Sequence, residues 1–206
     1  VEVVETASVP VLAAADIYKQ LSPSIVYIDT PDGTGSGIIL SNGYVLTNAH
    51  VVSLHEDVRV WGADGDHFSV PVYARDWSRD LALVGPFSTS LPAVNFAEPR
   101  ELLPGEPVYL IGFPGEGEVA PVASITAGLV SRMRSNACTG LDFIQTDALI
   151  AGGQSGGALL DAGGNLVAIL VSHFIIGPTD KDDGDDILPQ QFFLGSGHLI
   201  SPLLSQ

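Results

Sequence analysis

The sequence predicts an all-β protein in which two six-stranded antiparallel β-barrels follow a short N-terminal helix. Short apolar runs rich in Val, Ile and Leu alternate with turns drawn from 23 glycines and 14 prolines, a pattern typical of many short strands. These runs form two series of about six, one on each side of a proline-rich segment. No helical period interleaves them, which argues against a parallel α/β sheet.

The first half of the chain supplies the helix and the first barrel. Residues 11–21 have apolar positions at helical spacing and end before the Ser22-Pro23 breaker, so a short helix is predicted within an N-terminal extension, residues 1–21. The first barrel is expected over residues 22–98. Its predicted strands are Ile25–Asp29, Gly37–Leu40, Tyr44–Thr47, Val58–Trp61, Val70–Ala74 and Leu81–Val84.

The second half begins with a predicted linker. Residues 96–107 contain three prolines, which is typical of a crossing between two units, and residues 99–206 are assigned to this linker, the second barrel and a C-terminal segment. The predicted strands are Val108–Ile111, Val119–Ala127, Leu129–Met133, Leu141–Thr146, Ala158–Leu160 and Leu166–Ser172.

The charge balance narrows the classes of partner and cofactor. The formal net charge is −16, so phosphate repulsion argues against nucleic acid as a partner, while the acidic surface serves solubility, a salty habitat or the steering of basic polypeptides. The acidic loop 180–186 lacks EF-hand spacing and is interpreted as solvated; whether it binds a cation stays open. We expect no cofactor and no metal site. The one cysteine, Cys138, can form no intramolecular disulfide and is expected to be a structural thiol.

The two ends of the sequence bear on targeting. No apolar run approaches the roughly 20 residues that cross a bilayer. The first residues lack an initiator Met and a basic n-region, which is typical of a mature or trimmed chain, in which an upstream targeting signal or membrane anchor would not be visible.

Three local patterns carry chemistry. In Gly-Gly-Gln-Ser155-Gly-Gly-Ala a serine lies among small residues between two strand runs, where the backbone N–H groups of Gly153 and Ser155 can converge on a developing oxyanion. His50 follows a strand pattern and small residues, as a general base would. Asp80 precedes a buried apolar run and can orient the imidazole. The alternatives are a glycine-rich hairpin, a structural histidine and a strand cap.

The rival residues have weaker settings. Asp76 lies in a more polar stretch than Asp80, and the remaining histidines do not follow a strand end with small neighbours. These other histidines are His55, His67, His173 and His198. The order His50, Asp80, Ser155 is that of chymotrypsin rather than of subtilisin or the α/β-hydrolases, and it predicts a site in a cleft between the two barrels.

Four motifs together resemble the HtrA (Deg) family of trypsin-like serine proteases. They are Gly35-Ser-Gly-Ile-Ile-Leu, Thr47-Asn-Ala-His-Val-Val, Asp80-Leu-Ala-Leu-Val and Gly153-Gln-Ser-Gly-Gly-Ala-Leu, and the likeness runs from Leu21 to Ser172. The resemblance implies a chymotrypsin-like fold, ATP-independent cleavage of unfolded or flexible polypeptides, and a role in protein quality control. It also favours an extracytoplasmic location, whether periplasmic, secreted or membrane-anchored.

The chain departs from that family at several positions. It has Gln154 where the family usually has Asn, and Ala158 where it usually has Pro; because position 154 is expected to contribute only its backbone, neither change should affect the chemistry. It has neither the Asp before the serine nor the free Ile-Val-Gly-Gly start of zymogen-type trypsins. Loop ordering rather than N-terminal cleavage is therefore expected to control activity. The short loop between residues 30 and 35 argues against higher oligomers built through it.

The resemblance also implies a specificity pocket and an assembly. Its walls are expected to include Leu149, Ile150, Ser172, His173 and Phe174, which predicts an apolar, shallow pocket that prefers small to medium apolar residues; a protonated His173 would instead accept Glu. The N-terminal segment, residues 9–21, is expected to pack on its own protomer or within a homotrimer. A PDZ module or a membrane anchor is expected only in a longer protein.

The sequence leaves two alternatives to an active endopeptidase. One is a catalytically latent scaffold that binds unfolded polypeptide, and the other is an esterase on the same fold. The physiological substrate, the oligomeric state and the activation state of the loops are not determined by the sequence.

Overall fold

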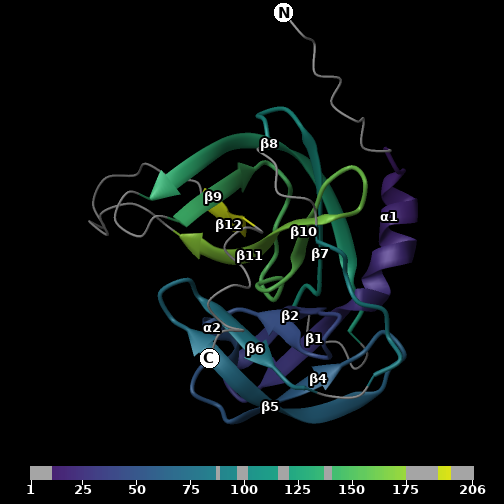
Figure 1. Cartoon of the computed structure of the whole chain (residues 1–206), viewed down its shortest axis with the longest axis vertical. Coiled ribbons are helices and arrows are strands. Elements are labelled where there is room, and N and C mark those ends of the chain that lie inside the picture. The colour runs from purple at the N-terminus through teal and green to yellow at the C-terminus, as the bar shows by residue number, and fades with distance from the viewer. Residues whose placement is uncertain are drawn as a thin grey trace, which may run out of the picture.

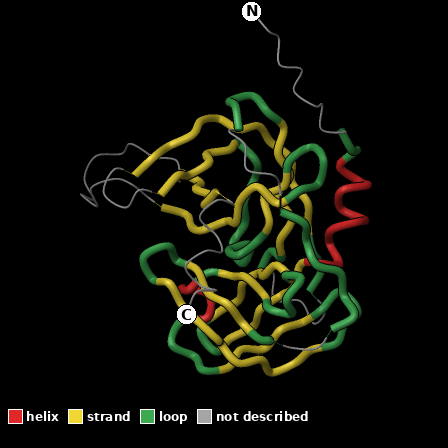
Figure 2. Tube along the Cα trace, in the orientation of Figure 1, coloured by secondary structure: helices red, strands yellow, loops and turns green. Residues whose placement is uncertain are grey.

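A computed structural model describes residues 11–86, 89–96, 102–115, 121–136, 141–174 and 190–195. It consists of two closed antiparallel barrels, one above the other, with helix α1 (Ala14–Leu21) alongside them (Figure 1). Figure 2 shows that strands dominate both units. The predicted all-β fold with a short N-terminal helix is confirmed. The interpretations of Cys138, of the acidic loop 180–186 and of His198 lie outside the described residues.

The first barrel closes in the order β1-β2-β3-β6-β5-β4. Its interior is filled by a cluster of mainly β-branched side chains, including Val26, Ile28 and Val60. Alternation along β4 places every second residue inside, as expected for a strand with one buried face. The elements are the 3-10 turn Ser22–Ser24, β1 Ile25–Thr30, β2 Gly33–Ile39, β3 Val45–Thr47, helix α2 Ala49–Val52, β4 Asp57–Trp61, β5 His67–Asp76 and β6 Leu81–Val84.

The second barrel closes in the order β10-β11-β12-β9-β8-β7. A separate cluster that includes Leu110, Val130 and Leu159 fills its interior. The strands are β7 Pro107–Gly112, β8 Ser124–Asn136, β9 Leu141–Thr146, β10 Ala158–Leu160, β11 Leu166–Phe174 and β12 Gln190–Gly195.

Six strands form the second barrel, but they are not the six that the sequence predicted. The runs Val119–Ala127 and Leu129–Met133 form one long strand, β8, because Gly128 between them does not turn the chain. A Cβ at Gly128 would collide with Ala148 N, so this glycine allows a close backbone approach. The sixth strand is β12, which follows the acidic loop and was not predicted.

A third apolar cluster lies between the barrels. It joins Ile38 and Leu46 of the first barrel to Ile111 and Ile169 of the second, all fully buried. Burial of each such side chain stabilises the fold by about 1.5–3 kcal/mol. The two barrels are therefore held in one relative position, which fixes residues that face each other across the boundary.

The N-terminal segment packs on its own chain. Ile17 of α1 is fully buried in the cluster between the barrels. The Tyr18 hydroxyl donates to the carbonyl of Ala123 at 2.8 Å, and the Leu12 N–H donates to Ala162 at 2.8 Å. This segment thus braces the second barrel against the first. Neither described helix has the length and apolar character needed to cross a membrane.

Candidate active site

His50 lies on α2, a single helical turn that begins directly after β3. The sequence predicted only the end of a strand here. Ala49, Val51 and Val52 of this turn are buried, so its apolar residues anchor it to the first barrel while the His50 side chain stays 46% exposed. A base that must exchange protons with a substrate needs this access.

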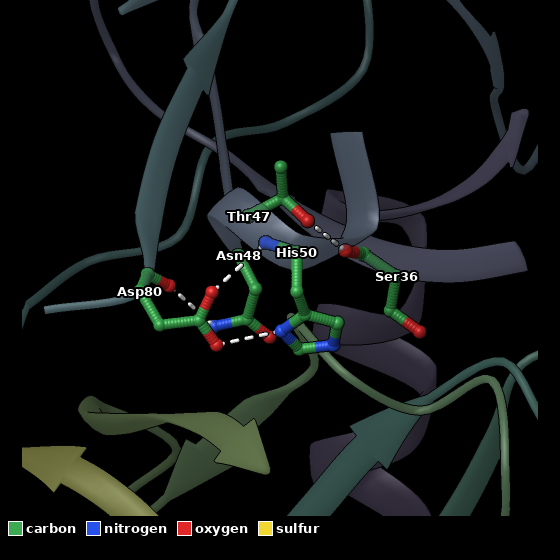
Figure 3. A network of polar contacts seen from close by, with 5 residues as sticks. All are labelled: Ser36, Thr47, Asn48, His50 and Asp80. Carbon is green, nitrogen blue, oxygen red and sulfur yellow. Dashed lines mark hydrogen bonds and ion pairs between the residues drawn. The ribbon is translucent and has the colours of Figure 1, made fainter. Parts of the chain in front are cut away.

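The Asp80 carboxylate holds His50 at two atoms. Its Oδ2 lies 2.6 Å from Nδ1 of the ring, and its Oδ1 accepts the backbone N–H of His50 at 2.9 Å (Figure 3). The imidazole is thereby fixed in position, and its Nε2 is left to face other groups. A short contact of this kind is typical of a charge-assisted hydrogen bond.

Asp80 occupies a strained backbone conformation directly before β6. Its φ is +55°, in the left-handed region that non-glycine residues rarely adopt. The Asn48 side chain donates to the Asp80 carbonyl at 2.9 Å (Figure 3). Asn48 is fully buried, and its Oδ1 has no hydrogen-bond partner among the described residues. Sequence reasoning missed Asn48, although its place two residues before His50 marks it as a neighbour of the site.

Asp76, the rival to Asp80, has a structural role. Its carboxylate accepts hydrogen bonds from the N–H and hydroxyl of Ser78 and contacts the Arg79 guanidinium at 2.7 Å. Burial raises the pKa of Asp76, but the hydrogen bonds from Ser78 and Arg79 and the Arg79 charge outweigh it and hold the pKa below its usual value. Asp76 thus shapes the turn that leads into Asp80.

Residues 151–157, named here the serine loop, present Ser155 beside the first barrel. The N–H of Ser36 on β2 donates to the Ser155 carbonyl at 2.7 Å, across the boundary between barrels. Gly156 has a φ of +84°, and a Cβ there would collide with Ser36 O and crowd Thr47 Oγ1. Only glycine fits this close approach. Since Thr47 lies three residues before His50, the serine loop meets the segment that carries the histidine.

Ser36 joins the serine loop to both barrels through its side chain. The fully buried hydroxyl donates to the Gly153 carbonyl at 3.2 Å and accepts the N–H of Phe113 at 2.8 Å. The Ser36 carbonyl in turn accepts the Thr47 hydroxyl at 2.7 Å (Figure 3). Sequence reasoning gave Ser36 no role; its signal was a hydroxyl between two glycines of a strand.

Gln154 corrects an expectation from the sequence. The side chain was expected to take no part, yet it is 1% exposed and both ends of its amide are bonded. Oε1 accepts the N–H of Ala151 at 2.7 Å, and Nε2 donates to the Ser124 hydroxyl at 2.8 Å. The residue before the serine therefore supports the loop through its side chain as well as its backbone.

Two N–H groups of the serine loop stay available. Within the described part of the chain, the N–H groups of Gly153 and Ser155 donate no hydrogen bond, while the Gly152 carbonyl accepts the Gly115 N–H at 2.7 Å. Over the same residues, no hydrogen bond joins the His50 ring to the Ser155 hydroxyl. The structure thus pairs His50 with Asp80 and brings the serine loop to the same boundary.

The predicted pocket residues are described only in part. Leu149 lies six residues before the serine and is 72% exposed. Ile150 is 8% exposed and packs in the interior cluster of the second barrel. Ser172, His173 and Phe174 belong to β11, but their side chains lie outside the described part of the structure.

The remaining histidines with described side chains have other partners. His55 Nε2 lies 2.9 Å from an oxygen of Asp32, and the His67 ring stacks on Trp61 with centroids 4.3 Å apart. Among the residues that the structure describes, no group of three or more His, Cys, Asp or Glu is arranged to hold a metal ion.

The chain is similar to known proteases over most of its length. Residues 35–169 match the family model of a trypsin-like peptidase domain. Serine protease HTRA1 of Xenopus laevis is 34% identical over 191 residues, covering 81% of this chain and 41% of that protein. A Haemophilus influenzae relative, named as a periplasmic serine protease do/HhoA-like, is 36% identical over 160 residues, covering 74% and 33%.

A solved structure is also similar to this chain. The HtrA-type protease AlgW, determined with a tripeptide, superimposes with a TM-score of 0.79 and 30% identity, covering 94% of this chain and 63% of that one. The chain spans less than half the length of the two curated relatives above. The family match and these relatives show that the chain belongs to the trypsin-like peptidase family, as a serine protease domain of the HtrA type.

Proposed function

We propose that this chain is a serine endopeptidase that hydrolyses peptide bonds of unfolded or flexible polypeptides with His50, Asp80 and Ser155 as its catalytic triad. The observation that carries the proposal is the pair of hydrogen bonds that the Asp80 carboxylate accepts from the backbone and the ring of His50, at the boundary where the serine loop meets β2. A histidine with only a structural role would not require both a carboxylate partner and a nearby serine in a glycine-rich loop.

Each member of the triad has a distinct task. Ser155 Oγ attacks the carbonyl carbon of the scissile bond while His50 Nε2 takes its proton. His50 then returns that proton to the leaving amine, and an acyl-enzyme remains on Ser155 until water hydrolyses it by the reverse steps. Asp80 keeps the proton on Nδ1 and stabilises the imidazolium. No hydrogen bond joins His50 to Ser155 among the described residues; catalytic hydrogen bonds that are absent from a free enzyme can form on substrate binding.

The oxyanion of the tetrahedral intermediate would be stabilised by the N–H groups of Gly153 and Ser155. Their lack of partners among the described residues supports this role, because preorganised donors that need not break other bonds stabilise the transition state most. The bond from the Gly115 N–H to the Gly152 carbonyl favours the same role, since it fixes the orientation of the planar peptide group that also contains the Gly153 N–H.

The pocket for the residue before the scissile bond is proposed to be apolar and shallow. The position six residues before the serine holds Leu149, so no carboxylate is present there to pair with Lys or Arg. Ile150, Ser172, His173 and Phe174 complete the proposed walls, with Phe174 limiting the depth. Small to medium apolar residues are expected to be preferred.

The wider biology is proposed by likeness. The word 'periplasmic' in the name of the Haemophilus influenzae relative supports an extracytoplasmic location. A role in protein quality control is proposed from the resemblance to the HtrA family. A homotrimer is proposed in which the N-terminal segment contributes to contacts between protomers in addition to its contacts within the chain. Light scattering that returned a monomer at every concentration would contradict that assembly.

Fluorophosphonate labelling and casein cleavage, measured on separate samples because a labelled serine can no longer attack a substrate, distinguish the three candidate functions. The proposed endopeptidase reacts with the probe and cleaves casein, and Ser155→Ala does neither. Labelling without casein cleavage would favour an esterase. Casein binding without labelling would favour the latent scaffold.

A further inference from the structure

The residue before the serine has a side chain whose buried contacts are not explained by the triad. Gln154 reaches from the serine loop to the paired ends of β7 and β8. Its amide orientation is fixed, because the Ala151 N–H can only donate and therefore must face Oε1. Nε2 is left to donate to the Ser124 hydroxyl, and this hydroxyl in turn donates to the Gly112 carbonyl at 3.3 Å.

The barrel leaves room for this side chain. Gly112 lies at the end of β7, and a Cβ there would come within 3.3 Å of the Gln154 Cβ. The stem of Gln154 thus lies close to the backbone of Gly112, where a side chain at position 112 would crowd it. A buried amide with both ends bonded in a confined space resists rearrangement.

The length of the side chain matters. Gln154 spans from Ala151 N, on its own loop, to Ser124 on β8. Asn is one methylene shorter, about 1.5 Å, and cannot keep both contacts from the same backbone position. The glutamine, where the resembling family usually has Asn, is therefore matched to the serine of β8 in this chain.

The bonds of Gln154 act on the loop segment that carries the proposed oxyanion donors. Ala151 and Gln154 are joined twice, because the Gln154 N–H also donates to the Ala151 carbonyl at 3.3 Å. This closes a small ring of the backbone around Gly152 and Gly153. Within the ring the Gly153 N–H keeps no partner in the described structure, as an oxyanion donor must.

We propose that the Gln154 side chain is a positioning residue, which together with Ser124 holds the serine loop in the shape that leaves the Gly153 and Ser155 N–H groups free for the oxyanion. The inference rests on the proposed function. Gln154 touches no reacting atom; it acts through the loop, as supporting residues behind a catalytic group do.

The test combines hydrogen–deuterium exchange of the serine loop with casein kinetics for Gln154→Met, Gln154→Asn and Ser124→Ala. Met keeps the length and volume without hydrogen bonds. We expect faster exchange in the loop and a kcat about 10- to 100-fold lower, the scale of a misplacement near 1 Å, with KM changed less than about twofold. Ser124→Ala should act in the same direction, and adding it to Gln154→Met should cost little more.

The matched control is Thr30→Val, which removes a side-chain hydrogen bond to the Gly33 carbonyl at 2.9 Å in the first barrel. It should lower the melting temperature without changing loop exchange or kcat. Wild-type kcat in Gln154→Met, or loop exchange no faster than in the control, would overturn the inference. If Gln154→Met fails to fold, Gln154→Asn and Ser124→Ala give the same decision. An inactive wild type would defeat the proposed function, and exchange would still decide whether Gln154 braces the loop.

Discussion

The carboxylate of Asp80 is hydrogen-bonded to both the ring and the backbone of His50, with Oδ2 2.6 Å from Nδ1 and Oδ1 2.9 Å from the main-chain nitrogen. One carboxylate therefore fixes the tautomer, the ring orientation and the helical turn that carries the ring. Asp80 is 24% exposed at its side chain, so water screens this pair only in part.

Asp80→Asn should lower kcat about 10⁴-fold, because an amide can keep the contact yet favours the wrong imidazole tautomer. The fold should persist, since Asn is isosteric with Asp. Casein turnover and circular dichroism of the purified variant test this. Activity within tenfold of the wild type would show that Asp80 does not orient the base.

Asn48→Ala should lower kcat about 10- to 100-fold, because the strained Asp80 backbone would lose the donor that holds its carbonyl. KM should change little, because Asn48 is buried away from substrate. Asn42→Ala is a suitable control, since Asn42 also makes a local side-chain bond, to Tyr44 N at 3.3 Å, in an exposed turn. Equal kinetics of the two variants would argue against a positioning role for Asn48.

Asp76→Asn should destabilise the fold at neutral pH but not in strong acid. Burial raises the pKa of Asp76, yet its bonds to Ser78 and Arg79 leave the net pKa lowered from 3.8. Such a group contributes stability above its unfolded-state pKa and loses it as pH falls through the lower folded-state pKa. The gap in melting temperature between wild type and variant should therefore be full at pH 6 and close as pH falls below about 3.8. A gap that widened in acid would refute the assignment.

The enzyme should cleave a denatured protein mainly at peptide bonds that come directly after Val, Ala, Ile or Leu. Leu149 supplies no counter-charge, and misfits of one methylene in an apolar pocket cost roughly 1–3 kcal/mol. Mass spectrometry of the products identifies the sites. Dominant cuts after Lys, Arg or Phe would show that the pocket has been misread, whereas cuts after Glu that increase as pH falls would assign His173 to specificity.

The architecture was predictable because short apolar runs and turns are local signals. The failures were non-local. Gly128 resembles a turn in sequence, yet it lies within β8 because Ala148 packs against it. Strand β12 is short and follows an acidic segment, and it becomes a strand by pairing with β11 and β9. Neither fact can be read from neighbouring residues alone.

The site shows the same division. His50, Asp80 and Ser155 could be predicted because the residues next to each of them in sequence indicate its chemical role. The supporting residues Ser36, Asn48 and Gln154 were missed or dismissed, because their roles come from partners between 30 and 117 positions away in sequence. The Asn48 and Gln154 bonds depend on how distant segments pack within one barrel, and the Ser36 bond depends on how the two barrels pack together. Composition or periodicity does not encode that packing.

The position of the fluorophosphonate adduct tests the proposed catalytic triad most directly. The labelled protein is digested and the modified peptide is sequenced by mass spectrometry, with His50→Ala treated in parallel. We expect one adduct, on Ser155, formed at least about 10³-fold more slowly in His50→Ala because the serine has lost its base. An adduct on any other residue, or unchanged labelling of Ser155 in His50→Ala, would contradict a catalytic triad at this site.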